Sequence, residues 1–361
     1  MKVGILGAGP VGCGAAAYLE GEGHRAAIWS PSGKRTAGLL AGAPLIARGA
    51  IEGRFHPTVA EDARSAVDGA DAILLAVPGN AQKAVADAIA PHVAAGQTIL
   101  IGSHHSFSAL YISRLLAARG IVVPVVAWGT TLTTGQQHAP GEVNVSTLRK
   151  KIDAATVPAS LQAPGLAVCR DVFGDRFVER EGLLAIALSN LNPQNHLALA
   201  LTNFTRIEQG EEWEQFLYYT PSVGRLVEAL DAERLAIAAA CGVKVRTVFE
   251  HLHLSYHVPV DNVSNMIQAV QAEGRGGVGP KSVDTRYVTE DCPFGLVMTA
   301  RLGRMVDRPA RLHEAGVHLL SALYGRDFET ENNLLDAIGF DAMTIDDIKR
   351  VSRDGYGPEH C

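Results

Sequence analysis

The N-terminal segment constrains the fold of this chain most, because the apolar run Val3–Leu6 leads directly into the sequence GAGPVG of residues 7–12. An alanine-rich stretch follows. This order predicts a strand, a tight turn at Gly7 and a helix that Gly12 allows to pack closely on the strand, while Gly9 lets the backbone approach a pyrophosphate. The sequence therefore predicts a dinucleotide site, with a purely structural glycine turn as the alternative. The residues assigned to this site are Gly7, Gly9, Pro10, Val11 and Gly12.

Apolar runs alternate with helical stretches through the first third of the chain. The runs Ala72–Val77, Thr98–Ile101 and Ile121–Trp128 are typical of buried strands, and such alternation predicts a parallel sheet covered by helices. Helical periodicity dominates beyond residues 155–165, a segment with two prolines that is typical of a linker. A chain of 361 residues is expected to form about two domains. We predict an α/β Rossmann-type domain with a parallel sheet at residues 1–155, followed by an all-helical domain at residues 156–361.

The loop after the second predicted strand indicates which cofactor the site prefers. The run Arg25–Trp29 is followed by the sequence SPSGKR of residues 30–35, which has no carboxylate to bind a ribose 2′-hydroxyl. Hydroxyls and cations attract a 2′-phosphate, so we predict NADP(H) over NAD(H); the alternative is a solvated loop with a weak NADH preference. The residues assigned to this contact are Ser30, Ser32, Lys34 and Arg35. Val77 and Pro78 end their strand, where we expect the backbone either to line the cofactor path or to form a plain turn.

Polar side chains interrupt an apolar helical segment of the second predicted domain. Asn192 before Pro193 is typical of an N-cap followed by the first helical residue. At about 100° per residue, His196 lies about 40° around the helix from Asn192, with Asn203 close to the same line. We assign Asn192 and Asn203 to substrate binding. A histidine on this stripe is suited to general acid catalysis near neutral pH, and a satisfied core histidine is the alternative.

A charged segment further along supplies candidate partners for this histidine. Within residues 279–291, Arg286 is suited to binding a substrate carboxylate and Asp291 to orienting an imidazole, whereas a solvated, salt-bridged loop is the alternative. His104 follows the 98–101 strand and is a candidate substrate contact. The histidines at 251, 253 and 257 have no completing carboxylate or cysteine nearby, so we expect no metal site.

The second-domain motifs resemble those of the octopine/nopaline (opine) dehydrogenase family. The similarity rests on Asn192-Pro193 with His196 and Asn203, on residues 221–223 and 231–236, and most closely on the sequence RYVTEDCPFGLV of residues 286–297. It extends over nearly the whole chain and implies a Rossmann-type domain joined to a helical substrate domain, with catalysis in the cleft between them. The resemblance further implies NAD(P)H-dependent reductive condensation of a 2-oxo acid with the amino group of an amino acid or another amine, by hydride transfer to an imine. In this reaction it makes His196 the catalytic histidine, Asp291 its carboxylate partner and Arg286 the arginine that binds the substrate carboxylate.

Two segments depart from the family pattern. Residues 129–137 lack an arginine that many members carry, and residues 102–106 stand where many members have a glycine-rich run. Both fall where substrate would bind, so a second interpretation is an NADP-dependent carbonyl or 2-oxo acid reductase (a hydroxy-acid dehydrogenase) on the same scaffold. A third is a nucleotide-binding protein without catalysis. The three interpretations differ in what cofactor oxidation requires. The first needs an oxo acid together with an amine, the second needs an oxo acid alone, and the third predicts no oxidation.

Composition and charge exclude several other classes. The formal charge is −6 without a basic patch, which argues against a nucleic-acid partner. No apolar run reaches the roughly 18 residues of a membrane span, and the early glycines leave no signal-peptide core. The 5 cysteines are scattered without a C-x-x-C pair, which fits a reduced, cytoplasmic protein. We expect small-molecule substrates and no membrane partner, and the sequence is compatible with a homodimer.

Overall fold

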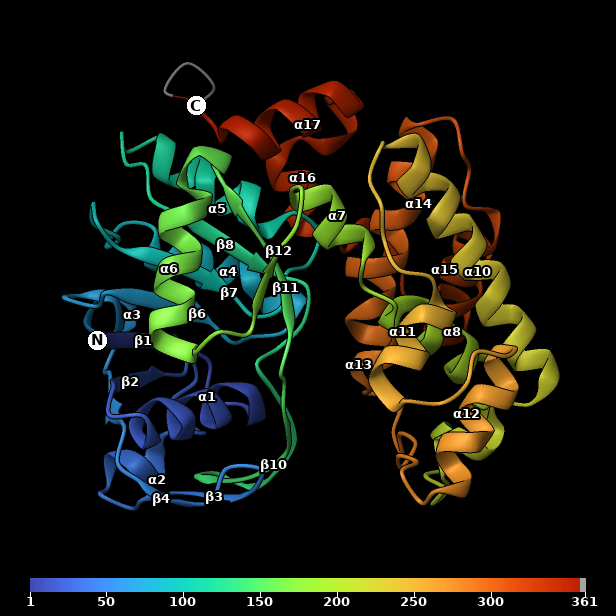
Figure 1. The fold of residues 1–361 in the computed structure, drawn as a ribbon, viewed down its shortest axis with the longest axis horizontal. Helices are drawn as coiled ribbons and strands as arrows, with labels where there is room; N and C mark the ends of the chain where they lie inside the picture. Colours follow the sequence, from blue (N-terminus) through green and yellow to red (C-terminus); the bar gives the residue numbers. More distant parts are fainter. Residues whose placement is uncertain (358–361) are drawn as a thin grey trace. The chain divides into compact units, whose positions relative to one another are not determined.

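The computed structural model describes residues 1–357 and divides into two compact units. The first unit consists of Met1–Ala187 together with residues 346–357, and the second is Leu188–Ile345. Figure 1 shows the elements of each unit, coloured along the sequence. Of the five cysteines, Cys361 lies outside the described residues.

An eight-stranded sheet forms the centre of the first unit, in the order β12-β11-β8-β7-β6-β1-β2-β5 (Figure 1). All neighbours run parallel except β11, which runs antiparallel to β8. The short apolar runs form strands because β6, β7 and β8 are buried along their whole lengths, as expected for strands covered on both faces. The predicted Rossmann-type domain with a parallel sheet is confirmed. The strands are β1 (Lys2–Leu6), β2 (Arg25–Trp29), β5 (Thr58–Val59), β6 (Ala72–Leu75), β7 (Thr98–Ile101), β8 (Val125–Trp128), β11 (Ile152–Val157) and β12 (Phe177–Glu179).

Helices cover this sheet in two layers. α1 (Pro10–Gly21) and α6 (Gln162–Phe173) contact each other and share one apolar core with the sheet. α3 (Ala63–Val67), α4 (Gly79–Ile89) and α5 (Ser108–Ala117) form the other contiguous layer. Crossovers between parallel strands are right-handed, so the reversal of strand order at β1 puts the two layers on opposite faces. Ligands bind at the carboxyl ends of the strands beside such a reversal.

A second sheet, in the order β4-β3-β10-β9, was not predicted from the sequence. Residues 129–137, the segment without the family arginine, contain the start of β9, and β9 packs on α1. The packing is close because a Cβ atom at Gly14 would lie only 2.6 Å from Oγ1 of Thr133. Strand β3 pairs in parallel with β10, far along the chain, which no local pattern reveals. The strands are β3 (Leu45–Gly49), β4 (Gly53–Phe55), β9 (Thr133–Ala139) and β10 (Glu142–Leu148), and the short helix α2 (Ala37–Leu40) precedes them.

The division between the units falls later than the boundary expected at residue 155. That residue lies within β11, and the supposed linker 155–165 consists of the end of β11, the 3-10 turn Ala159–Leu161 and the start of α6. Pro158 follows the strand and Pro164 occupies the first turn of the helix, where no backbone N–H is needed. The C-terminal helix α17 (Ile345–Asp354) and residues 355–357 return to the first unit, where the Tyr356 backbone N–H donates to Oγ of Ser113 at 3.4 Å.

Helices and short turns build the second unit, which confirms the predicted helical domain. Its described residues include one isolated β-bridge, between Glu214 and Val278. The fully buried Arg234 connects separate segments of the unit. It pairs with Asp231 at 2.6 Å and donates to the carbonyl oxygens of Leu188 and Arg246. The helices are α7 (Leu183–Leu188), which spans the division, then α8 (Asn192–Thr202), α9 (Phe204–Glu208), α10 (Pro221–Ala240), α11 (Val248–Tyr256), α12 (Val263–Ala272), α13 (Arg286–Thr289), α14 (Val297–Met305), α15 (Arg311–Tyr324) and α16 (Asn333–Ile338).

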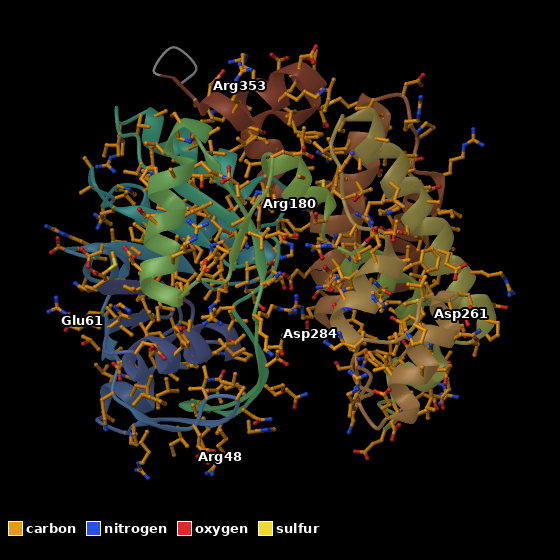
Figure 2. All side chains as sticks on the ribbon, viewed as in Figure 1. Arg48, Glu61, Arg180, Asp261, Asp284 and Arg353 are labelled. Carbon is orange, nitrogen blue, oxygen red and sulfur yellow. The ribbon has the colours of Figure 1, made fainter. Side chains whose placement is uncertain are left out.

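Charged side chains cover the outside of both units. Glu61 and Arg48 in the first unit and Asp261 in the second are exposed and point outward (Figure 2). Among the described residues, none of the helices combines the length and apolar character needed to cross a membrane.

Candidate active site

A histidine and a carboxylate from distant parts of the chain meet in the second unit. Nδ1 of His196, on α8, lies 2.6 Å from Oδ2 of Asp291, which follows α13. Asp291 is 1% exposed, whereas the His196 side chain keeps 15% of its surface open. The bond at Nδ1 directs the other ring nitrogen, Nε2, away from the carboxylate. This is the arrangement in which a carboxylate fixes the tautomer of an imidazole that transfers protons.

Within residues 1–357, the carboxylate of Asp291 has His196 as its hydrogen-bond partner. Its second oxygen, Oδ1, is buried and has no hydrogen-bond partner among the described residues. A buried carboxylate with a single bonded oxygen needs a nearby positive charge. The His196 imidazole is placed to provide that charge when it is protonated.

Tyr287 is a further member of this group, and the sequence did not single it out. Its ring stacks on the His196 ring with centroids 3.7 Å apart and an angle of 7° between the planes. Its hydroxyl donates to Oε1 of Gln215 at 2.7 Å. Burial is the main cause that raises the pKa of Tyr287, so the phenol stays protonated. The only available signal was its place four residues before Asp291.

Arg286 lies on the same short helix and remains accessible. Its side chain is 54% exposed, and its Nε lies 3.2 Å from Oε2 of Glu290, which is 3% exposed. The ion pair holds the Nε side of the guanidinium on the helix. The half-exposed side chain can therefore still offer its two terminal nitrogens to an anion.

The two asparagines of the predicted stripe differ in their surroundings. Asn192 is exposed and is the first residue of α8, with Leu191 in the cap position, so the predicted N-cap role of Asn192 is wrong. The backbone N–H of Asn192 bonds instead to Oδ1 of Asn190 at 3.0 Å. Helix α8 ends at Thr202, which takes Asn203 out of the helical periodicity. The amide of Asn203 is buried and donates to the Leu199 carbonyl at 3.0 Å. It thus provides a hydrogen-bond donor for one of the last carbonyl groups of α8.

The glycine-rich turn of the first unit has the geometry expected of a phosphate-binding loop. Gly7 adopts a φ of +123°, and its N–H donates to the Trp29 carbonyl at 2.8 Å. A Cβ atom at Gly12 would lie 1.9 Å from the carbonyl oxygen of Gly7, so only glycine fits. Gly9 caps α1 without any side-chain bond, and Pro10 is the first helical residue. Free N–H groups at the start of α1 are thus left for an anion.

Arg35 reaches this turn from the loop that follows β2. Its Nη1 atom lies 3.0 Å from the position of a Cβ atom at Gly9. A turn closed by the Gly33 N–H on the Ser30 carbonyl at 2.9 Å directs the loop there. Lys34 and Arg35 are exposed and form no ion pair within residues 1–357. Ser30 is buried, whereas Ser32 is exposed near the turn.

Gln137, on the unpredicted second sheet, also contacts the glycine-rich turn. Its Nε2 donates to the Ala8 carbonyl at 3.3 Å. At the end of β6, the Val77 carbonyl accepts from Gln82 at 3.4 Å, and Pro78 occupies the cap position of α4. Because β6 pairs with β1, where the strand order reverses, Val77 and Pro78 follow a strand that borders this switch point, and ligands of such sheets bind there.

His104 is a buried, neutral imidazole after β7. Neither of its ring nitrogens has a hydrogen-bond partner among the described residues. Burial, together with His105, lowers the pKa of His104 to about 3, so the ring is uncharged near neutral pH. Its ring meets the Phe107 ring edge-on, with centroids 6.1 Å apart.

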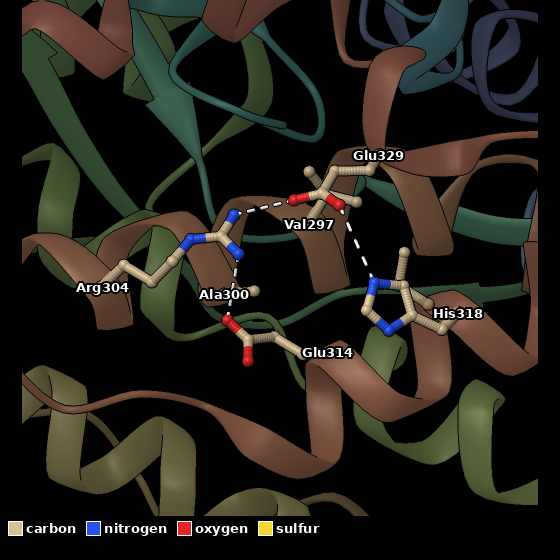
Figure 3. Close-up of a pocket in the computed structure, with 7 residues that line it drawn as sticks. Val297, Ala300, Arg304, Glu314, His318 and Glu329 are labelled. Atoms are coloured by element: carbon tan, nitrogen blue, oxygen red, sulfur yellow. Dashed lines mark hydrogen bonds and ion pairs between the residues drawn. The ribbon is translucent and has the colours of Figure 1, made fainter.

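A surface hollow elsewhere in the second unit is unrelated to these residues. Figure 3 shows Arg304 in this hollow between Glu314 and Glu329, at 3.0 Å and 2.9 Å. The positive charge of Arg304 is balanced by the two glutamates, and none of the predicted site residues lines the hollow. No group of three or more histidine, cysteine or acidic side chains that could hold a metal gathers within residues 1–357.

Comparison with known proteins gives consistent matches. The domain family described as NAD/NADP octopine/nopaline dehydrogenase, alpha-helical domain, matches residues 179–324, and the family described as NADP oxidoreductase, coenzyme F420-dependent, matches residues 2–102. The chain is 33% identical to an opine dehydrogenase of Arthrobacter sp. (strain 1C), over 96% of this chain and 97% of that protein.

Solved structures share the fold. Octopine dehydrogenase in complex with NADH and agmatine superimposes with a TM-score of 0.80 at 15% identity, over 96% of this chain and 97% of that one. Yersinopine dehydrogenase with bound NADP+ gives a TM-score of 0.69 at 17% identity, over 100% of this chain and 93% of that one.

Proposed function

The chain belongs to the opine dehydrogenase family of NAD(P)-dependent oxidoreductases, and we propose that His196 and Asp291 form the acid–base pair of its reaction. In an opine-type reaction, a 2-oxo acid and an amine condense to an imine, and reduction of the imine gives a secondary amine. The observation that carries the assignment is the 2.6 Å contact between Nδ1 of His196 and Oδ2 of Asp291. It leaves Nε2 as the position from which a proton is given or taken.

The proton chemistry follows from the balance of the reaction. An oxo acid, an amine, NAD(P)H and one proton give a secondary amine, water and NAD(P)+. Water leaves the carbinolamine only when its hydroxyl is protonated, and the imine accepts a hydride most readily as an iminium ion. We propose that protonated His196 donates from Nε2 and that Asp291, in contact with Nδ1, stabilises the imidazolium. The bound nicotinamide supplies the hydride.

Arg286 is proposed to bind the carboxylate of the 2-oxo acid. It lies five residues before Asp291 and presents a half-exposed guanidinium. Two parallel N–H bonds to a carboxylate would orient the oxo acid as well as hold it. Asn192, exposed one turn before His196 on α8, is proposed as a further substrate contact. We propose that Asn203 supports the end of the helix, since its amide already bonds there.

We propose NADP(H) as the preferred cofactor. The glycine-rich turn fits a pyrophosphate because Gly9 has no Cβ atom between the turn and Nη1 of Arg35, and α1 begins there at Pro10. The residues proposed to hold the cofactor are Gly7, Gly9, Pro10, Val11, Gly12, Val77 and Pro78. Arg35 supports the preference, because its guanidinium lies beside Gly9 and forms no ion pair in the described part of the chain, and the loop has no carboxylate. The residues proposed to bind a 2′-phosphate are Ser30, Ser32, Lys34 and Arg35.

Two further proposals concern His104 and the setting of the enzyme. His104 follows β7 at the carboxyl edge of the sheet, so its neutral ring is proposed to meet the substrate or the nicotinamide. The four described cysteines are buried thiols without disulfides, which supports a reducing cytoplasmic setting. Light scattering would distinguish a monomer from the homodimer that the sequence allows.

The reaction is tested by oxidation of NADPH and NADH, followed by near-ultraviolet absorbance, with a panel of 2-oxo acids. Each acid is tested alone and with a panel of amines. We expect turnover only when an acid and an amine are both present. Equal turnover with an oxo acid alone would instead identify a carbonyl reductase.

A further inference from the structure

The turn that holds Asp291 contacts the His196 ring on two sides. Tyr287 and Asp291 are four residues apart, so their side chains emerge on the same face of this turn. Thr285 caps α13 by accepting the Tyr287 N–H at 3.3 Å, which fixes where the turn begins. One short segment thus sets both the edge contact and the face contact of the imidazole.

The edge contact alone leaves some freedom in the plane of the ring. A hydrogen bond at Nδ1 tolerates a range of angles, so small coupled rotations about χ1 and χ2 of His196 can tilt the imidazole while the bond is kept. A parallel ring at 3.7 Å restricts this tilt, because it would drive one edge of the imidazole into the Tyr287 face. The direction of Nε2 is then determined as well.

The Tyr287 ring is itself held at its far end. Its hydroxyl donates to Oε1 of Gln215, and the backbone N–H of Gln215 donates to the Gly277 carbonyl at 2.8 Å. Tyr287 is half-buried and packs against the apolar core of the second unit. A tyrosine with its ring packed and its hydroxyl bound is a rigid surface for another ring.

We propose that Tyr287 is a positioning residue that fixes the plane of the His196 ring, and therefore the direction in which Nε2 transfers a proton. The proposal rests on the proposed role of His196 in catalysis. Tyr287 acts only through the histidine. Loss of the stacked ring should therefore slow the chemical step without weakening the binding of cofactor or substrate.

The test compares Tyr287→Leu, which removes the ring, with Tyr287→Phe, which keeps it. We expect Tyr287→Leu to lower kcat about tenfold with each KM within about twofold, and Tyr287→Phe to restore most of the kcat. Tyr324→Leu is the matched control, since Tyr324 packs against the same core and its ring contacts are with Phe204 and Phe328. An unchanged kcat in Tyr287→Leu, or an equal loss in Tyr324→Leu, would overturn the proposal.

A spectroscopic readout separates this proposal from the proposed function. The proton between Nδ1 of His196 and Asp291 gives a low-field NMR resonance, assigned by its loss in His196→Gln. We expect it to shift or broaden in Tyr287→Leu and to persist in Tyr287→Phe; an unchanged resonance in the Leu variant contradicts positioning. Full turnover by His196→Gln would instead refute the catalytic role of the histidine.

A second variant covers the case in which Tyr287→Leu does not fold. Tyr287→Met fills the space of the ring with a flexible side chain that offers no planar face to the imidazole. We expect kcat to fall about tenfold, together with a shifted Nδ1 resonance. If neither changes, the proposal is refuted.

Discussion

Nδ1 of His196 lies 2.6 Å from Oδ2 of Asp291, although the two residues are 95 positions apart in the sequence. The carboxylate is almost completely buried, and its other oxygen has no hydrogen-bond partner in the described part of the chain. The bond therefore fixes one tautomer of the neutral imidazole and stabilises the imidazolium. Both effects suit a residue that must give and take protons at Nε2.

Replacing Asp291 with asparagine keeps the size of the side chain but removes its charge. We expect kcat to fall about 10²- to 10⁴-fold, because the wrong tautomer is favoured and the imidazolium loses its partner. The dissociation constant of NADPH, measured by calorimetry, should stay the same. A kcat close to that of the parent enzyme would exclude Asp291 from the acid–base pair.

Replacing Arg286 with glutamine should weaken binding of the oxo acid. A lost charge-assisted contact is worth about 1.5–3 kcal/mol, so the KM for the oxo acid should rise about 10- to 100-fold. The KM for the amine should change less. Arg225→Gln is the control, since Arg225 is exposed and bonds only to Ser222 among the described residues. Equal effects of the two substitutions would argue against a carboxylate site at Arg286.

Replacing Arg35 with alanine should reduce the preference for NADPH. The dissociation constant for NADPH should rise about tenfold or more, and that for NADH by much less, because only NADPH carries the 2′-phosphate. Fluorescence titration measures both constants. Arg48→Ala, which removes an exposed arginine from β3 (Figure 2), should leave both unchanged. If Arg35→Ala weakens the two cofactors equally, the guanidinium binds the pyrophosphate instead.

The buried His104 should make the folded protein sensitive to mild acid. Burial and the nearby His105 lower its pKa to about 3, whereas the unfolded chain keeps a pKa of about 6.5. As the pH falls below about 6.5, the unfolded state gains a proton that the folded state does not, so stability decreases until about pH 3. Between pH 8 and pH 5 this loss amounts to about 2 kcal/mol. In urea titrations, the free energy of unfolding of His104→Leu should fall about 2 kcal/mol less between pH 8 and pH 5 than that of the parent protein. The same pH dependence in both proteins would contradict a buried neutral ring.

Much of the fold follows from local patterns in the sequence. Each buried apolar run specifies a strand, and the GAGPVG turn specifies a βα unit. In both cases the residues that carry the signal lie within a few positions of one another in the sequence. The second sheet could not be predicted in this way, because β3 and β10 pair across a long separation. The prolines at 158 and 164 were misleading, since the end of a strand and the first turn of a helix accept proline as readily as a linker does.

The candidate site, too, could be predicted only in part from the sequence. His196, Asp291 and Arg286 were identified from residue type and family resemblance, but the contact between the first two depends on the packing of α13 against α8. The stacking of Tyr287 depends on that packing too, because nothing in a single tyrosine indicates its tertiary neighbour. Asn203 was assigned to the stripe on the assumption that α8 continued, and the helix ends one residue earlier.

The proton-transfer role of His196 is tested most directly by single-turnover reduction in the His196→Gln variant. The variant is mixed with saturating NADPH and the oxo acid–amine pair found in the substrate panel, and loss of the reduced nicotinamide is followed by stopped flow. We predict a rate at least about 10²-fold below that of the parent enzyme, with the dissociation constant of NADPH within about twofold. A rate equal to that of the parent enzyme, with NADPH still bound, would show that His196 does not transfer the proton.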